Sequence, residues 1–271
     1  MTVDKDSVFA GTVPGLYESY LVPLIFEPYA VDVARRLSRN PPARVLEIAC
    51  GTGVVTRALA GALPATSTIV ASDLNQPMLD CAQTQLASEN VEWRQADALD
   101  LPFEDREFDA VVCQFGVMFF PDKPRGFAEA MRVLSPGGTY IFSVWDRIED
   151  NEIADVVTHA LATVFPDDPP RFMVRTPHGY HDVDVIRDDL ARGGITGAQI
   201  ETIAERSRAD SARDAAIAYC HGSPLRDEIF ARDPSRINEA TDAAERAVRK
   251  VFGDGAVDAK MQAHIVTVQK S

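Results

Sequence analysis

The sequence predicts an α/β fold in which a mostly parallel, seven-stranded sheet carries helices on both faces. Short β-branched and aliphatic runs alternate along the chain with segments of helical period, the pattern of βαβ units. Three successive strand-like runs each end close to an acidic residue, Glu47, Asp73 and Asp97. Ligands bind outside the carboxyl ends of the strands in such sheets, so these acids mark the candidate site.

The first strand, its turn and the helix that follows are the most informative segment. Residues 45–48 form the strand, a glycine-rich turn follows, and residues 54–62 read as a helix. Gly51 and Gly53 supply backbone conformations and clearance that a Cβ would deny, so the turn can approach a nucleotide-like ligand. Near the strand's end, the Glu47 carboxylate can meet a cationic or hydroxyl-bearing part of that ligand.

Two common nucleotide-binding turns do not fit this segment. A dinucleotide fingerprint needs a third glycine where this chain has Thr56, and no P-loop lysine follows the turn. The run E-x-x-C-G-T-G instead resembles motif I of class I S-adenosylmethionine-dependent methyltransferases. The resemblance implies a Rossmann-like sheet with an antiparallel last strand and S-adenosyl-L-methionine as cofactor, with S-adenosyl-L-homocysteine as product. It assigns these motif residues to the cofactor: Glu47, Ala49, Cys50, Gly51, Thr52 and Gly53.

The second strand, residues 68–73, ends in an acid that suits a ribose. Asp73 follows Gly53 by 20 residues and can accept hydrogen bonds from both ribose hydroxyls, a device that NAD enzymes share. A helix is predicted from Gln76 onward. The resemblance implies that Leu74 and Met78 lie against the adenosine, although plain core packing is an equal alternative for Met78.

Residues 91–103 hold the third strand and a segment after it that resembles the family's adenine-binding motif. In the family, the aspartate accepts from the adenine amino group and the next backbone N–H donates to the ring. This implies that role for Asp97 and Ala98, and the alternative is that Asp97 caps a turn.

The fourth strand, residues 108–115, ends at two further candidate positions. The resemblance implies that Gln114 and Phe115 lie beside the methionine half of the cofactor, at the substrate mouth. A sulfonium is a soft cation, and ring faces attract cations. The segment 134–145 then matches the family's L-x-P-G-G turn and fifth strand.

Together, these motifs cover residues 43–145 and resemble the type 11, ubiquinone/menaquinone-biosynthesis-like branch of the family. The implied activity is in-line transfer of a methyl group to an O, N or C nucleophile of a small-molecule metabolite. Two other classes stay open: an NAD-dependent oxidoreductase, and a non-catalytic protein that binds S-adenosylmethionine.

The chain is expected to divide into a cofactor-binding core, residues 43–146, and surrounding additions. Residues 182–207 hold a core helix, 183–192, and the sixth strand, 199–204. Residues 259–271 hold the seventh strand, 261–268. We expect a helical N-terminal flap at 1–42, broken or kinked at Pro23 and Pro28. Two insertions, 147–181 and 208–258, are expected to form a substrate cap, with a dimer interface as the alternative.

Four side chains are candidates for the acceptor side of the site, namely Tyr17, Tyr20, Trp145 and His178. Either tyrosine can close the site or merely pack its helix. His178 lies in a loop with a second histidine, and a general base, a metal ligand and an exposed loop histidine all remain open. The catalytic residue is left unassigned.

Composition narrows the possible partners. The 271 residues carry a formal net charge of −14, which argues against sequence-independent nucleic-acid binding, because such binding depends on neutralising phosphates. No apolar run reaches membrane-spanning length, and the N-terminus lacks a signal-peptide core, so a cytoplasmic location is expected. No metal-ligand constellation stands out, and we expect a monomer or homodimer acting on a small molecule.

Overall fold

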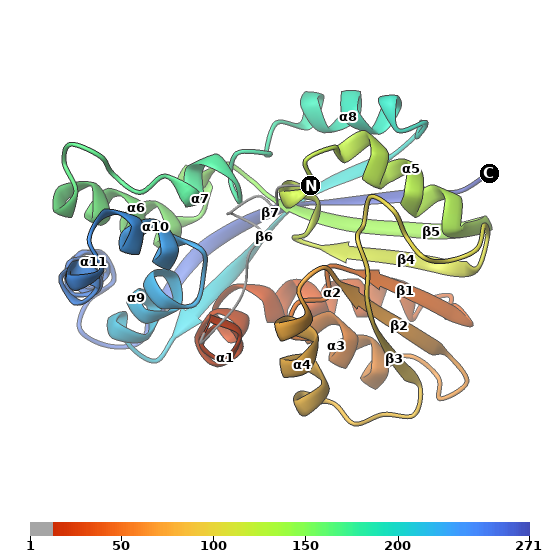
Figure 1. Cartoon of the computed structure of the whole chain (residues 1–271), viewed down its shortest axis with the longest axis horizontal. Coiled ribbons are helices and arrows are strands. Elements are labelled where there is room, and N and C mark those ends of the chain that lie inside the picture. The colour runs from red at the N-terminus through yellow and green to blue at the C-terminus, as the bar shows by residue number, and fades with distance from the viewer. Residues whose placement is uncertain (1–12) are drawn as a thin grey trace.

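A mixed sheet organises the protein, and the computed structural model describes it within residues 13–271 (Figure 1). Its strands are β1 (Arg44–Ile48), β2 (Thr68–Asp73), β3 (Val91–Gln95), β4 (Phe108–Gln114), β5 (Leu134–Trp145), β6 (Gln199–Ala209) and β7 (Val257–Gln269). Their order is β3-β2-β1-β4-β5-β7-β6. The first five pair in parallel, and β7 lies antiparallel between β5 and β6. This confirms the predicted fold class.

Helices cover the sheet on both sides (Figure 1). On one side α5 packs against α8, and on the other α2 packs against α3, with α4 beside β2 and β3. These five helices are α2 (Glu27–Leu37), α3 (Val54–Ala62), α4 (Gln76–Gln85), α5 (Lys123–Val133) and α8 (Val183–Arg192). Because both faces of β1 are covered, its last four residues are buried, which explains why all of them except Glu47 are aliphatic.

The N-terminal segment is one uninterrupted helical run. It comprises α1 (Val13–Leu16), the π-helix η2 (Tyr17–Phe26) and α2, whereas breaks or kinks were expected at Pro23 and Pro28. Pro23 lies inside the π-helical part, where the Glu27 N–H donates to the carbonyl of Val22, five residues back. Pro28 occupies the first turn of α2, where no N–H is needed. The predicted flap also includes residues 1–12, which lie outside the described residues.

The remaining helices gather at one end of the molecule, along the far part of β6 and β7 (Figure 1). They are η4 (Ile148–Asp150), α6 (Glu152–Val164), α7 (Phe172–Arg175), α9 (Ala212–His221), α10 (Leu225–Arg232), η5 (Pro234–Arg236) and α11 (Ile237–Phe252). A short 3₁₀ turn, η3 (Val117–Phe119), follows β4. Helices α6, α9 and α11 pack against one another, so the two predicted insertions form one helical group.

Strands β6 and β7 are longer than the sequence predicts. Pairing continues from Gln199↔Thr267 to Ala209↔Val257, whereas the expected strands covered residues 199–204 and 261–268. The added part is polar, and Arg206 forms an ion pair with Asp258 at 2.6 Å across the ribbon. A strand stabilised by cross-strand charges lacks the apolar alternation on which the prediction depended.

Candidate functional site

The glycine-rich turn after β1 is held in a strained but well-bonded conformation. Ala49, Gly51 and Gly53 all have positive φ, at 55°, 57° and 84°. The Cys50 N–H donates to the Ser72 carbonyl at 2.9 Å, which ties the turn to the end of β2. A non-glycine residue at positive φ is costly, so strain at Ala49 points to a functional constraint at this edge of the sheet.

Asp73 holds this turn in addition to facing the site. Its Oδ2 accepts from the Gly51 N–H at 2.9 Å, and its Oδ1 accepts from the Asn75 N–H at 2.8 Å. The carboxyl is 7% exposed, and burial raises its pKa, an effect that these backbone donors oppose. Asp73 and the glycine-rich turn after β1 are therefore joined in one hydrogen-bonded unit.

Glu47 is a buried carboxyl that favours its neutral form. Burial raises its pKa to about 8, which outweighs the hydrogen bond that its Oε2 accepts from the Thr56 hydroxyl at 2.6 Å. The nearby Asp73 charge raises the pKa further. At pH 7 Glu47 is mostly protonated in this structure, and an incoming cation would ionise it.

The two motif glycines face different surroundings. A Cβ on Gly51 would lie 3.6 Å from Met78 Cε and 3.7 Å from the Tyr17 hydroxyl. A Cβ on Gly53 would instead lie 3.1 Å from Trp93 Cη2, inside packed protein. Gly51 is thus the glycine beside the N-terminal helical run, and Gly53 is required for packing and for its left-handed conformation.

Other predicted cofactor residues line the same edge of the sheet. Met78 is buried and Leu74 is 43% exposed. The Asp97 Oδ1 accepts from the Leu99 N–H at 2.9 Å, which is the turn cap named as its alternative role, and Asp97 and Ala98 are both half-buried. Thr52 is buried, and its carbonyl accepts from Arg57 at 2.8 Å.

The end of β4 resembles the end of β1 in its strain. Phe115 has a φ of 54°, and its N–H donates to the Ser143 carbonyl at 3.1 Å. The Gln114 amide donates to the Phe26 carbonyl at 3.2 Å, while its Oε1 is buried and has no hydrogen-bond partner within the described part of the chain. An unpaired buried carbonyl oxygen is costly, and a ligand donor would satisfy it.

Aromatic rings continue from this point into one cluster. Phe115 stacks on Trp145 with centroids 3.8 Å apart and planes 5° from parallel. Phe26 packs against both of these rings, and Tyr17 stacks on Phe26 at 5.2 Å. Tyr17 and Trp145, both predicted on the acceptor side, are therefore joined through Phe26, whereas Tyr20 is a half-buried residue packed on the core.

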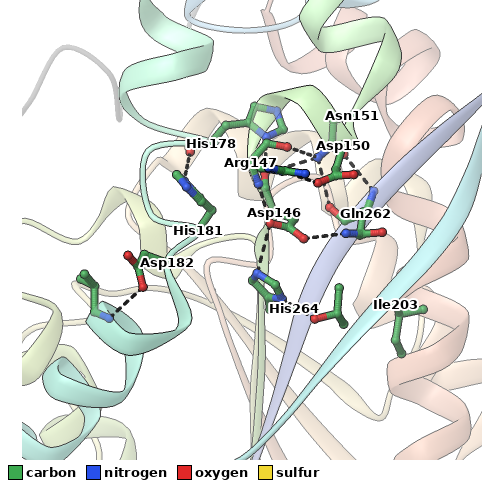
Figure 2. Close-up of polar contacts among 12 residues, drawn as sticks. Asp146, Arg147, Asp150, Asn151, His178, His181, Asp182, Ile203, Gln262 and His264 are labelled. Atoms are coloured by element: carbon green, nitrogen blue, oxygen red, sulfur yellow. Dashed lines mark hydrogen bonds and ion pairs between the residues drawn. The ribbon is translucent and has the colours of Figure 1, made fainter.

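His178 lies at the far side of this cluster, in a polar group that Figure 2 shows. Its ring centroid is 6.0 Å from that of Trp145, and its Nδ1 lies 2.8 Å from the Asp146 carbonyl. The Asp146 carboxylate accepts from Gln262 Nε2 at 2.7 Å and lies 3.3 Å from His264 Nε2. That last pair lacks hydrogen-bond geometry, since Nε2 of His264 is unbonded among described residues.

Sequence reasoning missed several residues that shape the site. Phe26 and Tyr29 come from the N-terminal helices and reach Trp145 far along the chain. Arg57 joins the cofactor turn to the N-terminal run through an ion pair with Glu18 at 2.7 Å. The aromatic spacing of residues 17–29 was the available signal, but no local pattern names a partner more than a hundred residues away.

The described residues hold neither a metal-binding cluster nor a membrane-spanning helix. Residues 13–271 contain no group of three or more histidine, cysteine or acidic side chains positioned to hold a metal ion. None of the helices in that range has the length and apolar character needed to cross a membrane.

Part of the chain is similar to a known family of methyltransferase domains. A family model described as a methyltransferase domain matches residues 46–142, which include the glycine-rich turn, Asp73 and Asp97. The demethylmenaquinone methyltransferase of Clavibacter sepedonicus is 40% identical over 114 residues. That segment is 42% of this chain and 45% of the relative, so the chain spans less than half the relative's length.

Solved structures share the fold at low identity. Phosphoethanolamine N-methyltransferase 2 of Haemonchus contortus, solved with phosphomonomethylethanolamine and S-adenosylhomocysteine, has a TM-score of 0.59 at 15% identity. The superposition covers 95% of this chain and 57% of that one. The [4+2]-cyclase SpnF has a TM-score of 0.52 at 18% identity, and the superposition covers 89% of this chain and 80% of the SpnF chain.

Proposed function

We propose that the protein transfers a methyl group from S-adenosylmethionine to a small-molecule acceptor. The single observation that carries this proposal is the unit formed by the glycine turn, Asp73 and Glu47 at the carboxyl edge of the sheet. The family match over this same segment supports it. An NAD-dependent oxidoreductase is disfavoured because the third glycine of its fingerprint is absent.

In the proposed binding mode each strand end contributes one contact. Asp73 accepts from the ribose hydroxyls, Asp97 and the Ala98 N–H meet the adenine, and Leu74 and Met78 contact the adenosine. Gln114, with its unpaired buried Oε1, and Glu47 suit the cationic methionine end. Gly51 leaves the space that this ligand needs beside Tyr17 and Met78.

The cofactor supplies an activated methyl group on a positive sulfur, so the chain's own residues mainly align the acceptor and exclude water. Phe115 and Trp145 offer ring faces that a sulfonium favours. The helical run at the N-terminus lies beside these two rings, as do the helical insertions. We assign both to the acceptor pocket. A dry, fixed approach of nucleophile to methyl carbon supplies most of the required rate enhancement.

Product analysis tests this proposal. The protein is incubated with methyl-deuterated S-adenosylmethionine and the small-molecule fraction of a bacterial extract, and products are followed by mass spectrometry. We expect at least one metabolite to acquire the labelled methyl group in proportion to enzyme. Cofactor binding without any labelled product would favour a non-catalytic role or another reaction, as on the SpnF fold.

The identity of the acceptor, the monomeric or homodimeric state and the cytoplasmic location stay predictions. The family match ends at residue 142, before both helical insertions, so it bears on the cofactor site and not on a particular acceptor. A small, neutral or cationic acceptor is compatible with the net charge of −14, which disfavours nucleic acid.

A further inference from the structure

The loop that carries His178 is held in a fixed conformation by hydrogen bonds and by close backbone packing. The His178 N–H donates to the Met173 carbonyl at 3.0 Å, and the His181 Nδ1–H donates to the His178 carbonyl at 2.8 Å. A Cβ on Gly179 would lie only 2.0 Å from the Arg175 carbonyl oxygen, so only glycine allows this close return of the chain. The His178 ring is therefore held in one place.

The hydrogen bond of His178 fixes which ring nitrogen carries the proton. A carbonyl oxygen can only accept, so the Nδ1 that lies 2.8 Å from the Asp146 carbonyl must be the N–H. In the neutral ring the other nitrogen, Nε2, is then an acceptor. Burial lowers the pKa of His178 to about 4, so the ring is neutral at pH 7.

Nε2 has two properties that suit a ligand. It has no hydrogen-bond partner among residues 13–271, and it is not among the fully buried unpaired atoms, although the residue is only 5% exposed. The remaining accessible surface thus includes an acceptor lone pair. The His178 ring lies 6.0 Å from the Trp145 ring between centroids, and Trp145 in turn stacks on Phe115 at the end of β4.

We propose that His178 is the catalytic residue that accepts, at Nε2, the proton of a hydroxyl acceptor as its oxygen is methylated. This deepens and rests on the proposed methyl transfer, and it selects oxygen acceptors over nitrogen and carbon. The acceptor's lone pair forms the bond to the methyl carbon, while the carbon–sulfur pair goes to sulfur. The acceptor's proton moves to Nε2, and the imidazolium then loses a proton to water.

A weakly basic imidazole is adequate for this step. A hydroxyl oxygen that has just gained a methyl group is an oxonium, whose proton is far more acidic than that of an imidazolium, so its transfer needs position more than basicity. The Asp146 carbonyl stabilises the imidazolium through the Nδ1–H, and the Asp146 carboxylate is itself held by Gln262. Asp146 acts through His178 and is a positioning residue.

The first arm of the test needs no acceptor. Nitrogen-15 spectra of the imidazole side chains report which ring nitrogen bears the proton, and His178→Gln assigns the signal. We expect the Nδ1–H form at pH 7, with and without S-adenosylhomocysteine. A His178 ring that carries its proton on Nε2, or on both nitrogens, would overturn the proposal whether or not the protein transfers methyl groups.

The second arm uses methyl-labelled S-adenosylmethionine and the small-molecule fraction of a bacterial extract. His178→Phe should lower the initial rate of label transfer at least tenfold, while His178→Gln, which can accept a hydrogen bond but not a proton, falls in between. The matched control is His159→Gln, whose ring is 77% exposed on α6 and whose rate should equal that of the wild type.

As a control, calorimetry with S-adenosylhomocysteine should show that the variants keep a folded cofactor site, with affinity within about twofold of the wild type. Wild-type rates in His178→Phe would overturn the role of His178 and leave the proposed function standing. Absence of labelling in the wild type itself would instead overturn the proposed function, and the tautomer measurement would still decide the state of His178.

Discussion

At the scale of single residues, Asp73 has two roles at the carboxyl edge of the sheet: it holds the turn after β1, and we assign it to the cofactor. Asp73 was predicted from its place after β2, but its bonds to the Gly51 and Asn75 N–H groups were not. Those bonds depend on the way the turn folds back over β2, which no sequence spacing specifies. Likewise, no spacing indicates that a Cβ on Gly53 would meet Trp93 and Ala82.

Replacing Asp73 tests both of its tasks. Asp73→Asn should weaken S-adenosylmethionine binding at least about tenfold, because a charge-assisted hydrogen bond contributes roughly 1.5–3 kcal/mol. It should also lower the free energy of unfolding by about 1–3 kcal/mol, because the carboxamide has one oxygen for the two backbone N–H groups of Gly51 and Asn75, and one of them loses its acceptor. Calorimetry and urea unfolding measure the two effects. Asp100→Asn, at an exposed position nearby, is the control, and an unchanged affinity in Asp73→Asn would refute the assignment.

The raised pKa of Glu47 predicts that ligand binding is coupled to the release of a proton. Its pKa of about 8 leaves it mostly protonated at pH 7, and a cationic ligand group beside it would lower that pKa. Binding of S-adenosylmethionine at pH 7 should therefore release a proton to the buffer. Titrations in phosphate and in Tris, which differ in ionisation enthalpy, should give different apparent enthalpies, and Glu47→Gln should remove the difference. Equal enthalpies for the wild type would contradict this coupling.

At the scale of elements, the N-terminal helical run connects the cofactor turn to the insertions. Arg57 of α3 binds Glu18 at 2.7 Å, and the Ser207 hydroxyl of β6 donates to the Leu24 carbonyl at 2.9 Å. Helix α9 packs on η2, where Gly222 allows close approach to Tyr17. Helical periodicity predicted these helices, and the bounds of α3 and α8 match it. Their mutual packing has no local signature, so the sequence alone did not decide between a lid and a dimer interface.

Hydrogen exchange can separate a lid from a fixed support. Adding S-adenosylhomocysteine should slow exchange in residues 14–25 and in at least one of the insertions, at constant oligomeric state, because the ligand would contact Tyr17 beside Gly51. Arg57→Met should reduce that protection, since it removes the ion pair with Glu18. Arg39→Met, at an exposed position that forms no ion pair within residues 13–271, is the matched control. Protection confined to the motif turns would reject the lid.

At the scale of the whole molecule, the topology assembles a site from segments that are far apart in sequence. The strand order brings the ends of β1 and β4 together, where a Cβ on Gly116 would lie 2.6 Å from the Ala49 Cβ. The cofactor edge was predictable because its motifs are local. The acceptor side was only partly so, because Trp145 meets Phe26 and His178 through tertiary packing alone.

The buried histidine makes stability depend on pH. Its pKa is about 4 in the folded protein against roughly 6.5 unfolded, so the unfolded chain binds more protons between these values. His178 therefore contributes stability that is present above pH 6.5 and is lost as pH falls through 4. The groups that act on it are His181, Asp146 and Glu149. Urea midpoints of wild type and His178→Gln should converge on acidification, and a constant difference from pH 7 to pH 4.5 would contradict this.

The most direct test of the central claim is isothermal titration of the wild-type protein with S-adenosylhomocysteine and, separately, with NAD. The turn after β1, with Asp73 at its base and Gly51 open beside Tyr17, should bind S-adenosylhomocysteine at one site per chain. It should bind NAD at least a hundredfold more weakly, because the third glycine that brings a pyrophosphate close to the helix is absent. Equal or tighter binding of NAD, or no binding of S-adenosylhomocysteine, would contradict the account.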